Sequence, residues 1–262
     1  MKFYQLTHSS TCCQEGVRPG KNQTAPRRLL WKTTEPAAER ERSAARVSAL
    51  SPLRFRHAAA GVVGIFFYIG IEIGVPGMLN LWMLDPRGAF EATSPAVAGS
   101  VTGMFFFLML VGRFAGSWIG GRFSSRAILS FCGAAALCCT VAGVLAMGRV
   151  VPMAVFTCPG FEVVHVPLGC RLLASVGLFA SVSWAATYNL TVEGLGEYTE
   201  AASGLVMTAL VGGGLLPLAQ GLLADRLGYA LSYAIPAFGA AYLLAYGLFW
   251  GRFGRDGARP SR

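Results

Sequence analysis

Six apolar stretches, each about twenty residues long or more, follow one another between Ala58 and Trp250. A helix of that length crosses a hydrocarbon core of about 30 Å. The composition agrees, since 54% of the residues are hydrophobic and only 13% are charged, against about 25% charged in a typical soluble domain. The sequence therefore predicts an all-α integral membrane protein. Its six transmembrane helices are expected at residues 58–82, 96–119, 127–147, 172–192, 203–223 and 229–250.

The positive charge is concentrated before the first stretch. Residues 1–57 hold 11 of the 22 Lys and Arg but only 4 of the 13 Asp and Glu. A polar, aperiodic segment of this kind is typical of a disordered tail, with an organelle transit peptide and a misassigned gene start as alternatives. Basic residues beside a membrane span favour its cytoplasmic side, so the charge does not indicate nucleic-acid binding.

The loops predict the orientation and one long connection. With six spans, the Arg54 and Arg56 flank and the basic tail 251–262 lie on the same side, which the positive-inside rule places in the cytoplasm. We expect a multi-pass protein of the plasma (inner) membrane with both termini cytoplasmic. The segment 150–169, which contains three prolines, is expected to be a long loop that partly dips into the membrane interface.

Glu72 lies in the middle of the first stretch. A charged side chain there costs about 2.5–3.5 kcal/mol on insertion scales, so it is a candidate for function. Helical spacing places Tyr68 and Pro76 on its face, with Asn80 close by, and all four are expected to line one cavity. The alternative is a protonated carboxyl that hydrogen-bonds a neighbouring helix.

Three further polar or aromatic residues are candidates for substrate binding. Trp184 and Asn189 lie in the fourth stretch with Tyr188, and such rings and amides suit sugar recognition; an aromatic interface belt is the alternative. Gln220 lies in the fifth stretch and either contacts substrate or bonds the backbone group freed by Pro217.

Small residues and one arginine predict close packing and gating. Gly112 and Gly116 form a small-residue stripe in the second stretch, next to Arg113, which either holds a gate in an ion pair or anchors the helix at the interface. The fifth stretch contains Pro217 and the triple glycine Gly212, Gly213 and Gly214, a combination typical of a helix that can open its backbone.

The sequence contains no motif that indicates catalysis or metal binding. The three histidines (His8, His57 and His165) have no catalytic partners in sequence, and no GxxxxGK[ST] phosphate-binding loop occurs. The seven cysteines lack metal-ligand spacing. We expect no enzyme activity, cofactor or metal.

Three segments carry a resemblance to a known family. Gly112–Trp118 (GRFAGSW), Tyr68–Val75 (YIGIEIGV) and Gly194–Asp225 resemble motifs of the eighth, seventh and eleventh helices of the fucose-permease-like sugar:proton symporters of the major facilitator superfamily. The resemblance implies that residues 58–250 are helices seven to twelve, the C-terminal six-helix half of a major-facilitator-type bundle.

The resemblance also implies a transport function and a further six-helix half. It implies transport of a sugar or similar small solute, proton-coupled in the intact architecture, with the substrate site between two halves. The proton-coupling carboxylates of that family are expected in the first half, which has no counterpart in residues 1–57. A second six-helix half or a homodimer is therefore an expected partner besides the bilayer. The alternative is a truncated, transport-inactive or regulatory membrane protein.

Overall fold

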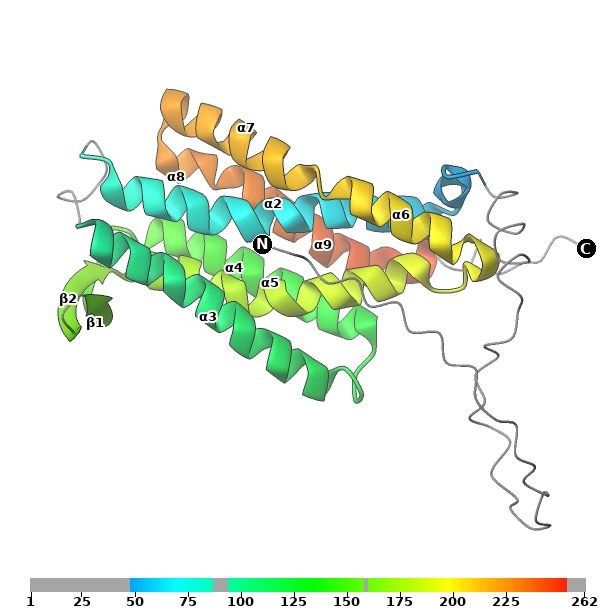
Figure 1. Ribbon diagram of the computed structural model, residues 1–262, viewed down its shortest axis with the longest axis horizontal. Coiled ribbons are helices and arrows are strands. Elements are labelled where there is room, and N and C mark those ends of the chain that lie inside the picture. The colour runs from blue at the N-terminus through cyan, green and yellow to red at the C-terminus, as the bar shows by residue number, and fades with distance from the viewer. Residues whose placement is uncertain (1–47, 87–93, 158–159, 254–262) are drawn as a thin grey trace, which may run out of the picture. The chain divides into compact units, whose positions relative to one another are not determined.

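The computed structural model describes residues 48–86, 94–157 and 160–253. Most of the basic tail predicted at residues 1–57 lies outside the described residues, as do residues 254–262 of the C-terminal tail. Six helices of the described chain are long and apolar enough to cross a membrane, which confirms the predicted fold class. Figure 1 shows them packed side by side as one bundle.

The helices follow the predicted stretches closely. Four spans are single helices: α2 (Arg56–Leu84), α3 (Pro95–Ile119), α4 (Ser125–Leu145) and α5 (Leu168–Val192). The fifth and sixth are divided into α6 (Thr199–Ala209) with α7 (Gly212–Leu227), and α8 (Tyr229–Ser232) with α9 (Ala234–Phe253). Two short 3₁₀ turns, η1 (Ser51–Arg54) and η2 (Gly196–Tyr198), precede α2 and α6.

The core forms where α2 and α5 pack against each other and against the surrounding helices. Fully buried side chains such as Ile65, Leu79, Phe105 and Leu173 fill it. Other large apolar side chains point outward, and Leu145 at the end of α4 is 80% exposed. This distribution is unfavourable in water but suits a helix bundle surrounded by lipid.

Glycines set how closely these helices approach. On Gly112 of α3, an added Cβ would overlap the backbone carbonyl of Leu178 on α5, and on Gly177 of α5 it would overlap the carbonyl of Phe105. Backbones this close are accessible only to residues without a side chain. The α3–α5 contact therefore depends on glycine from both helices.

The segment predicted as a long loop at residues 150–169 forms a β-hairpin instead. Strands β1 (Val150–Thr157) and β2 (Gly160–Pro167) pair antiparallel, with Val150 opposite Pro167. Both are edge strands, which tolerate proline, and the valines in both strands favour extended backbone. The expectation of a loop was wrong because it gave the prolines more weight than the valines, and the bundle is helical apart from this hairpin.

A tight turn interrupts the fifth span just before its triple glycine. The N–H groups of Leu210 and Val211 donate to the carbonyls of Met207 and Thr208, three residues earlier, at 3.3 and 3.2 Å. Such 3₁₀ bonding narrows the helix locally. Pro217 has no N–H, so the carbonyl of Gly213 receives no helical bond from it. The helical hydrogen bonding of the fifth span is thus interrupted twice, at Leu210 and at Pro217, about two turns apart.

Candidate functional site

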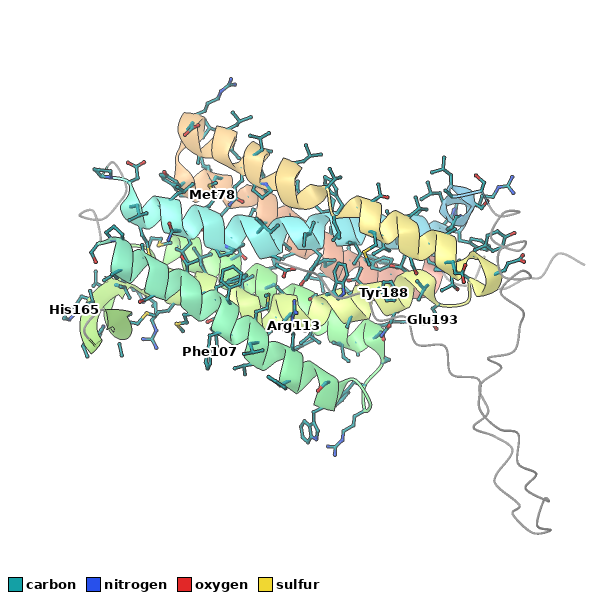
Figure 2. All side chains as sticks on the ribbon, viewed as in Figure 1. Met78, Phe107, Arg113, His165, Tyr188 and Glu193 are labelled. Carbon is teal, nitrogen blue, oxygen red and sulfur yellow. The ribbon has the colours of Figure 1, made fainter. Side chains whose placement is uncertain are left out.

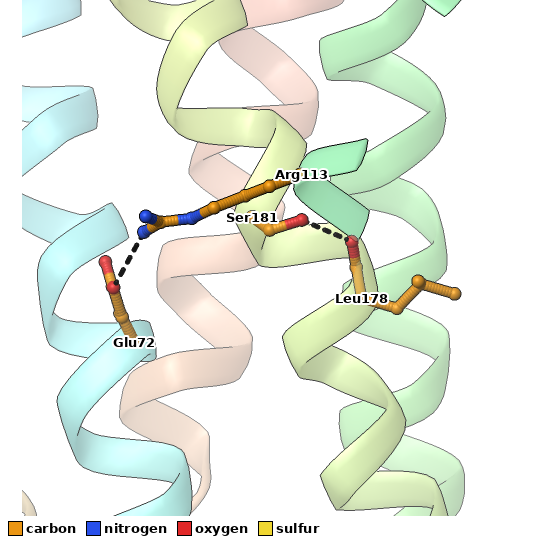
Figure 3. Close-up of polar contacts among 4 residues, drawn as sticks. All are labelled: Glu72, Arg113, Leu178 and Ser181. Atoms are coloured by element: carbon orange, nitrogen blue, oxygen red, sulfur yellow. Dashed lines mark hydrogen bonds and ion pairs between the residues drawn. The ribbon is translucent and has the colours of Figure 1, made fainter. Parts of the chain in front are cut away.

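An ion pair joins α2 to α3 within the spans. Arg113 Nη2 lies 3.7 Å from Glu72 Oε1, and Figure 3 shows the guanidinium reaching from one helix toward the other. The Glu72 side chain is 17% exposed and that of Arg113 58% exposed. Each charge alone is costly at this depth, and the pairing offsets part of that cost. The structure therefore assigns Arg113 a partner on α2.

A cavity of about 480 Å³ opens beside this pair. Tyr68 and Trp184 form one wall, their ring centroids 5.5 Å apart at an interplanar angle of 50°. The Tyr68 ring is buried, and its hydroxyl has no hydrogen-bond partner in the part of the chain that the structure describes. A buried donor without a partner is unfavourable unless a ligand or water satisfies it. The cavity is lined by Tyr68, Ile69, Glu72, Arg113, Gly116, Ser117, Ser181, Val182, Trp184, Ala185 and Leu210.

Sequence reasoning missed two hydroxyls of this cavity. Ser117 Oγ donates to the carbonyl of Phe114 at 2.8 Å, and Ser181 Oγ donates to that of Leu178 at 2.9 Å. Because each proton is already used within its own helix, both oxygens remain as acceptors toward the cavity. Serine is common at helix contacts in membranes, so nothing in the sequence singled these two out.

A second cavity, of about 650 Å³, adjoins the first along Ile69 and Glu72. Asn80 lines it, and its Nδ2 donates to Thr102 Oγ1 at 3.3 Å. Pro76 lines it too, and because proline has no N–H, the backbone carbonyl of Glu72 lacks its helical donor. Glu72 thus faces both cavities, whereas Tyr68 and Asn80 face one each.

Two predicted substrate contacts lie elsewhere. Asn189 lines a separate cavity of about 440 Å³ with Arg126 and Glu193, where α4 begins and α5 ends. Gln220 is 1% exposed and is packed against Gly74 of α2. Its Nε2 has no hydrogen-bond partner among the described residues. The structure therefore brings Glu72, Asn80 and Trp184 to adjoining cavities but leaves Asn189 and Gln220 apart from them.

Some of the predicted gating residues line the two cavities, and others lie at helix contacts. Gly116 lies against Val182 of α5, and Gly212 lies where a Cβ would overlap the Phe66 carbonyl of α2. A Cβ on Gly213 would lie 2.7 Å from Ile73 Cδ1, whereas one on Gly214 would meet nothing within 4 Å. Pro217 lines the second cavity. The first two glycines of the triplet thus make the α2–α7 contact.

Known transporters resemble most of this chain. It is 30% identical over 198 residues to the glucose/galactose transporter of Brucella abortus, a match of 76% of this chain and 43% of that protein. It is 24% identical over 197 residues to the L-fucose-proton symporter of Escherichia coli K12, a match of 75% and 40%. No family model matches the chain.

The fold also resembles that of a known transporter. The crystal structure of FucP, a major facilitator superfamily transporter in the outward conformation, superposes with a TM-score of 0.64 at 19% identity, covering 82% of this chain and 47% of FucP. The chain therefore shares the fold of that transporter over most of its described length and resembles named sugar transporters over about three-quarters of its sequence. Its relatives are sugar transporters and symporters, and it is a multi-pass integral membrane protein. The chain spans about half the length of the curated relatives it matches.

Metal binding has no cluster of ligands in the described residues. No group of three or more His, Cys, Asp or Glu side chains comes together there. The four cysteines that the structure describes are unpaired by disulfides, and two of them, Cys132 and Cys170, are buried. Buried Cys in a span acts as a small apolar residue.

Proposed function

We propose that residues 58–250 form the C-terminal six-helix half of a sugar transporter. In this proposal the chain binds a sugar or similar small polar solute and exchanges access to it between the two sides of the membrane. The names of the relatives and the half-length coverage support the proposal. In such transporters the substrate site lies at the interface of the two halves.

The observation that carries the proposal is the exposed ion pair on an otherwise apolar bundle. Arg113 is 58% exposed in the body of α3, and a guanidinium facing hydrocarbon at this depth is unfavourable. The face that carries it is therefore suited to an aqueous cavity closed by a second six-helix unit, either a separate half or another copy of the chain. The cavity beside it carries the groups that a sugar needs.

Five residues of the two adjoining cavities have a role in the proposed binding. The Trp184 ring stacks on the apolar face of a sugar, and the Tyr68 hydroxyl donates to a sugar oxygen. Glu72 accepts and Arg113 donates charge-assisted hydrogen bonds, which are stronger than neutral ones. Asn80 adds amide contacts from the adjoining cavity. Glu72, as the acidic member of the pair, is also the proposed site at which a proton is exchanged.

The residues away from the cavity have positional roles in this proposal. Gln220 and the glycines Gly212 and Gly213 let α7 shift along α2 between the two access states. Asn189 belongs to the opposite, expected cytoplasmic, closure near Glu193. Figure 1 shows η1, the end of α3 and the end of α9 at one end of the bundle, and the arginines near these ends favour the cytoplasmic side for it. We propose the plasma membrane as the location.

Partial coverage of the relatives favours a second candidate. A chain that matches 43% of a transporter is also what a transport-inactive or regulatory membrane protein derived from one would look like. Such a protein would retain the solute site without completing a transport cycle. Binding and uptake therefore need separate measurements.

The test is reconstitution of the full chain into proteoliposomes. Uptake of radiolabelled D-glucose, D-galactose and L-fucose is measured with and without an imposed pH gradient, and binding is measured on the same preparation by equilibrium dialysis. Saturable uptake that Glu72→Gln lowers and makes less dependent on pH supports transport. Binding without uptake supports the inactive half, and the absence of both contradicts the proposed site. Phe131→Ala, an exposed apolar position of α4, is the matched control.

A further inference from the structure

The β-hairpin has two faces that differ in what they contact. Its register places Val150 opposite Pro167, Pro152 opposite His165 and Ala154 opposite Val163. Because side chains alternate along a strand, these residues share one face, while Met153 and Val166 share the other and are buried in the bundle core. We call the exposed side chains of the first face the outer face: Val150, Pro152, Ala154, Val163 and His165.

The outer face is exposed, and it consists of four apolar side chains and His165, which Figure 2 labels on the hairpin. Val150 is 60% exposed and Val163 66% exposed, and no charged side chain accompanies them on this face among the described residues. A solvated hairpin packed on a core alternates apolar inward and polar outward residues. Here Val150, Pro152, Ala154 and Val163 make the outward side largely apolar as well, which indicates a second apolar environment on the outside.

The position of the hairpin places this face at the membrane boundary. Figure 1 shows β1 and β2 beside the first turns of α3, and β1 packs against that helix. The hairpin begins five residues after α4, whose 21 residues span about 30 Å. Leu145, the last residue of α4, is itself 80% exposed.

The unpaired backbone groups of the hairpin exclude a position within the hydrocarbon core. Both strands of a two-stranded sheet are edges, with N–H and C=O groups that point away from the partner strand. Such groups are not tolerated in hydrocarbon but can bond water and lipid headgroups. The outer face is therefore suited to the interface, where apolar side chains and polar backbone are both accommodated.

The base of the hairpin carries positive charge. Arg149 and Arg171 are both exposed and flank the two strands, whose ends are joined by the Leu168 N–H donating to the Arg149 carbonyl at 2.6 Å. Two guanidinium groups at a membrane surface attract anionic lipid phosphates. We propose that the outer face lies in the headgroup region of a leaflet that contains anionic phospholipid, held there by Arg149 and Arg171.

The proposal is independent of transport and is tested by measuring depth in the membrane. The full chain, with its seven native cysteines replaced, carries Val163→Cys labelled with the fluorophore NBD. It is reconstituted into nanodiscs of phosphatidylcholine alone or with phosphatidylglycerol. Nitroxide lipids labelled near the headgroup or deep in the chain, and aqueous iodide, serve as quenchers. Val150→Cys provides a second position on the same face, and a thermal melt matching the parent confirms that each variant folds.

Two matched positions calibrate the depth scale. Arg226→Cys lies at the exposed end of α7, and Phe131→Cys lies on the exposed side of α4, well inside its span. We expect the label at 163 to be quenched several-fold more by the shallow nitroxide than by the deep one, with position 131 showing the reverse and 226 responding to iodide. Iodide quenching at 163 equal to that at 226 overturns the proposal, as does deep quenching equal to that at 131.

Separate measurements test the role of the two arginines and the alternative that a second copy of the chain covers the outer face. Phosphatidylglycerol is expected to increase shallow quenching at 163, and Arg149→Gln with Arg171→Gln is expected to remove that increase. No response to phosphatidylglycerol overturns the anionic-leaflet assignment. The label at 163 could instead be protected from iodide and from both nitroxides, with cross-linking between two labelled chains. That result overturns the lipid assignment in favour of pairing between the hairpin edges of two copies.

Discussion

Arg113 on α3 reaches Glu72 on α2 at 3.7 Å. This contact lies farther from the loop that joins the two helices than the hydrogen bond between Asn80 and Thr102. The pair thus ties the two helices together along the edge of the cavity (Figure 3). The α2–α3 geometry at the proposed site is therefore linked to the charge of one carboxylate.

The ion pair gives the first prediction. Glu72→Gln and Arg113→Gln are each expected to weaken sugar binding by about tenfold or more, because each removes a charge-assisted hydrogen bond. Glu72→Gln is also expected to flatten the dependence of uptake on pH, since glutamine cannot exchange a proton. Binding by equilibrium dialysis and uptake between pH 5 and 8 check this. Uptake that keeps the parent's pH profile would make Glu72 a packing residue.

The hydroxyl of Tyr68 gives the second prediction. Tyr68→Phe is expected to leave thermal stability unchanged or slightly higher, because the hydroxyl has no partner among the described residues, while sugar affinity falls. Tyr233→Phe is the matched control. Its hydroxyl donates to the Val75 carbonyl at 3.1 Å, so its loss is expected to cost about 1 kcal/mol without affecting affinity. A stability loss at Tyr68 as large as at Tyr233 would contradict the prediction.

The α3–α5 contact gives the third prediction. Gly112→Ala is expected to destabilise the bundle by about 1–3 kcal/mol, because the new methyl group would overlap the Leu178 carbonyl. Gly103→Ala, on the same helix with nothing within 4 Å of the added Cβ, is expected to be neutral or stabilising. Thermal unfolding in one detergent compares them. Equal melting temperatures for the two variants would show that α3 can shift to relieve the overlap.

The triple glycine gives the fourth prediction. Gly212→Ala is expected to slow or abolish uptake, because the methyl group would overlap the Phe66 carbonyl and separate α7 from α2. Gly214→Ala, with open space around the added Cβ, is expected to retain uptake. The measurement is the initial uptake rate at matched amounts of reconstituted protein. Full activity of Gly212→Ala would exclude a tight α2–α7 contact from the transport cycle.

Hydropathy was sufficient to predict the six spans, because each must satisfy its backbone internally and cover the same membrane thickness. It did not show that the helix of the fifth span is interrupted at Leu210, since such an interruption depends on local hydrogen bonding and not on the apolar character of the residues. The hairpin at 150–167 was missed for a related reason. Strand pairing decided its structure, and pairing is not visible in a short segment that contains prolines.

The candidate site was predictable in its parts but not in its assembly. Glu72 and Arg113 each stood out as a charge within an apolar stretch, yet their pairing depends on how α2 and α3 cross. Asn189 and Gln220 stood out by the same criterion, and the structure places them away from the cavity of Trp184. Polarity identifies the residues that are unusual within a membrane span. The packing of the helices decides which of these residues lie together in one site.

The turn between α6 and α7 has a mechanical consequence. Leu210, which forms that turn, is also part of the cavity wall beside Trp184. In the proposed transporter, a solute in this cavity would lie directly against the interruption between α6 and α7, with no side chain between them. The size of the solute would then bear directly on how the two parts of the fifth span are placed relative to each other.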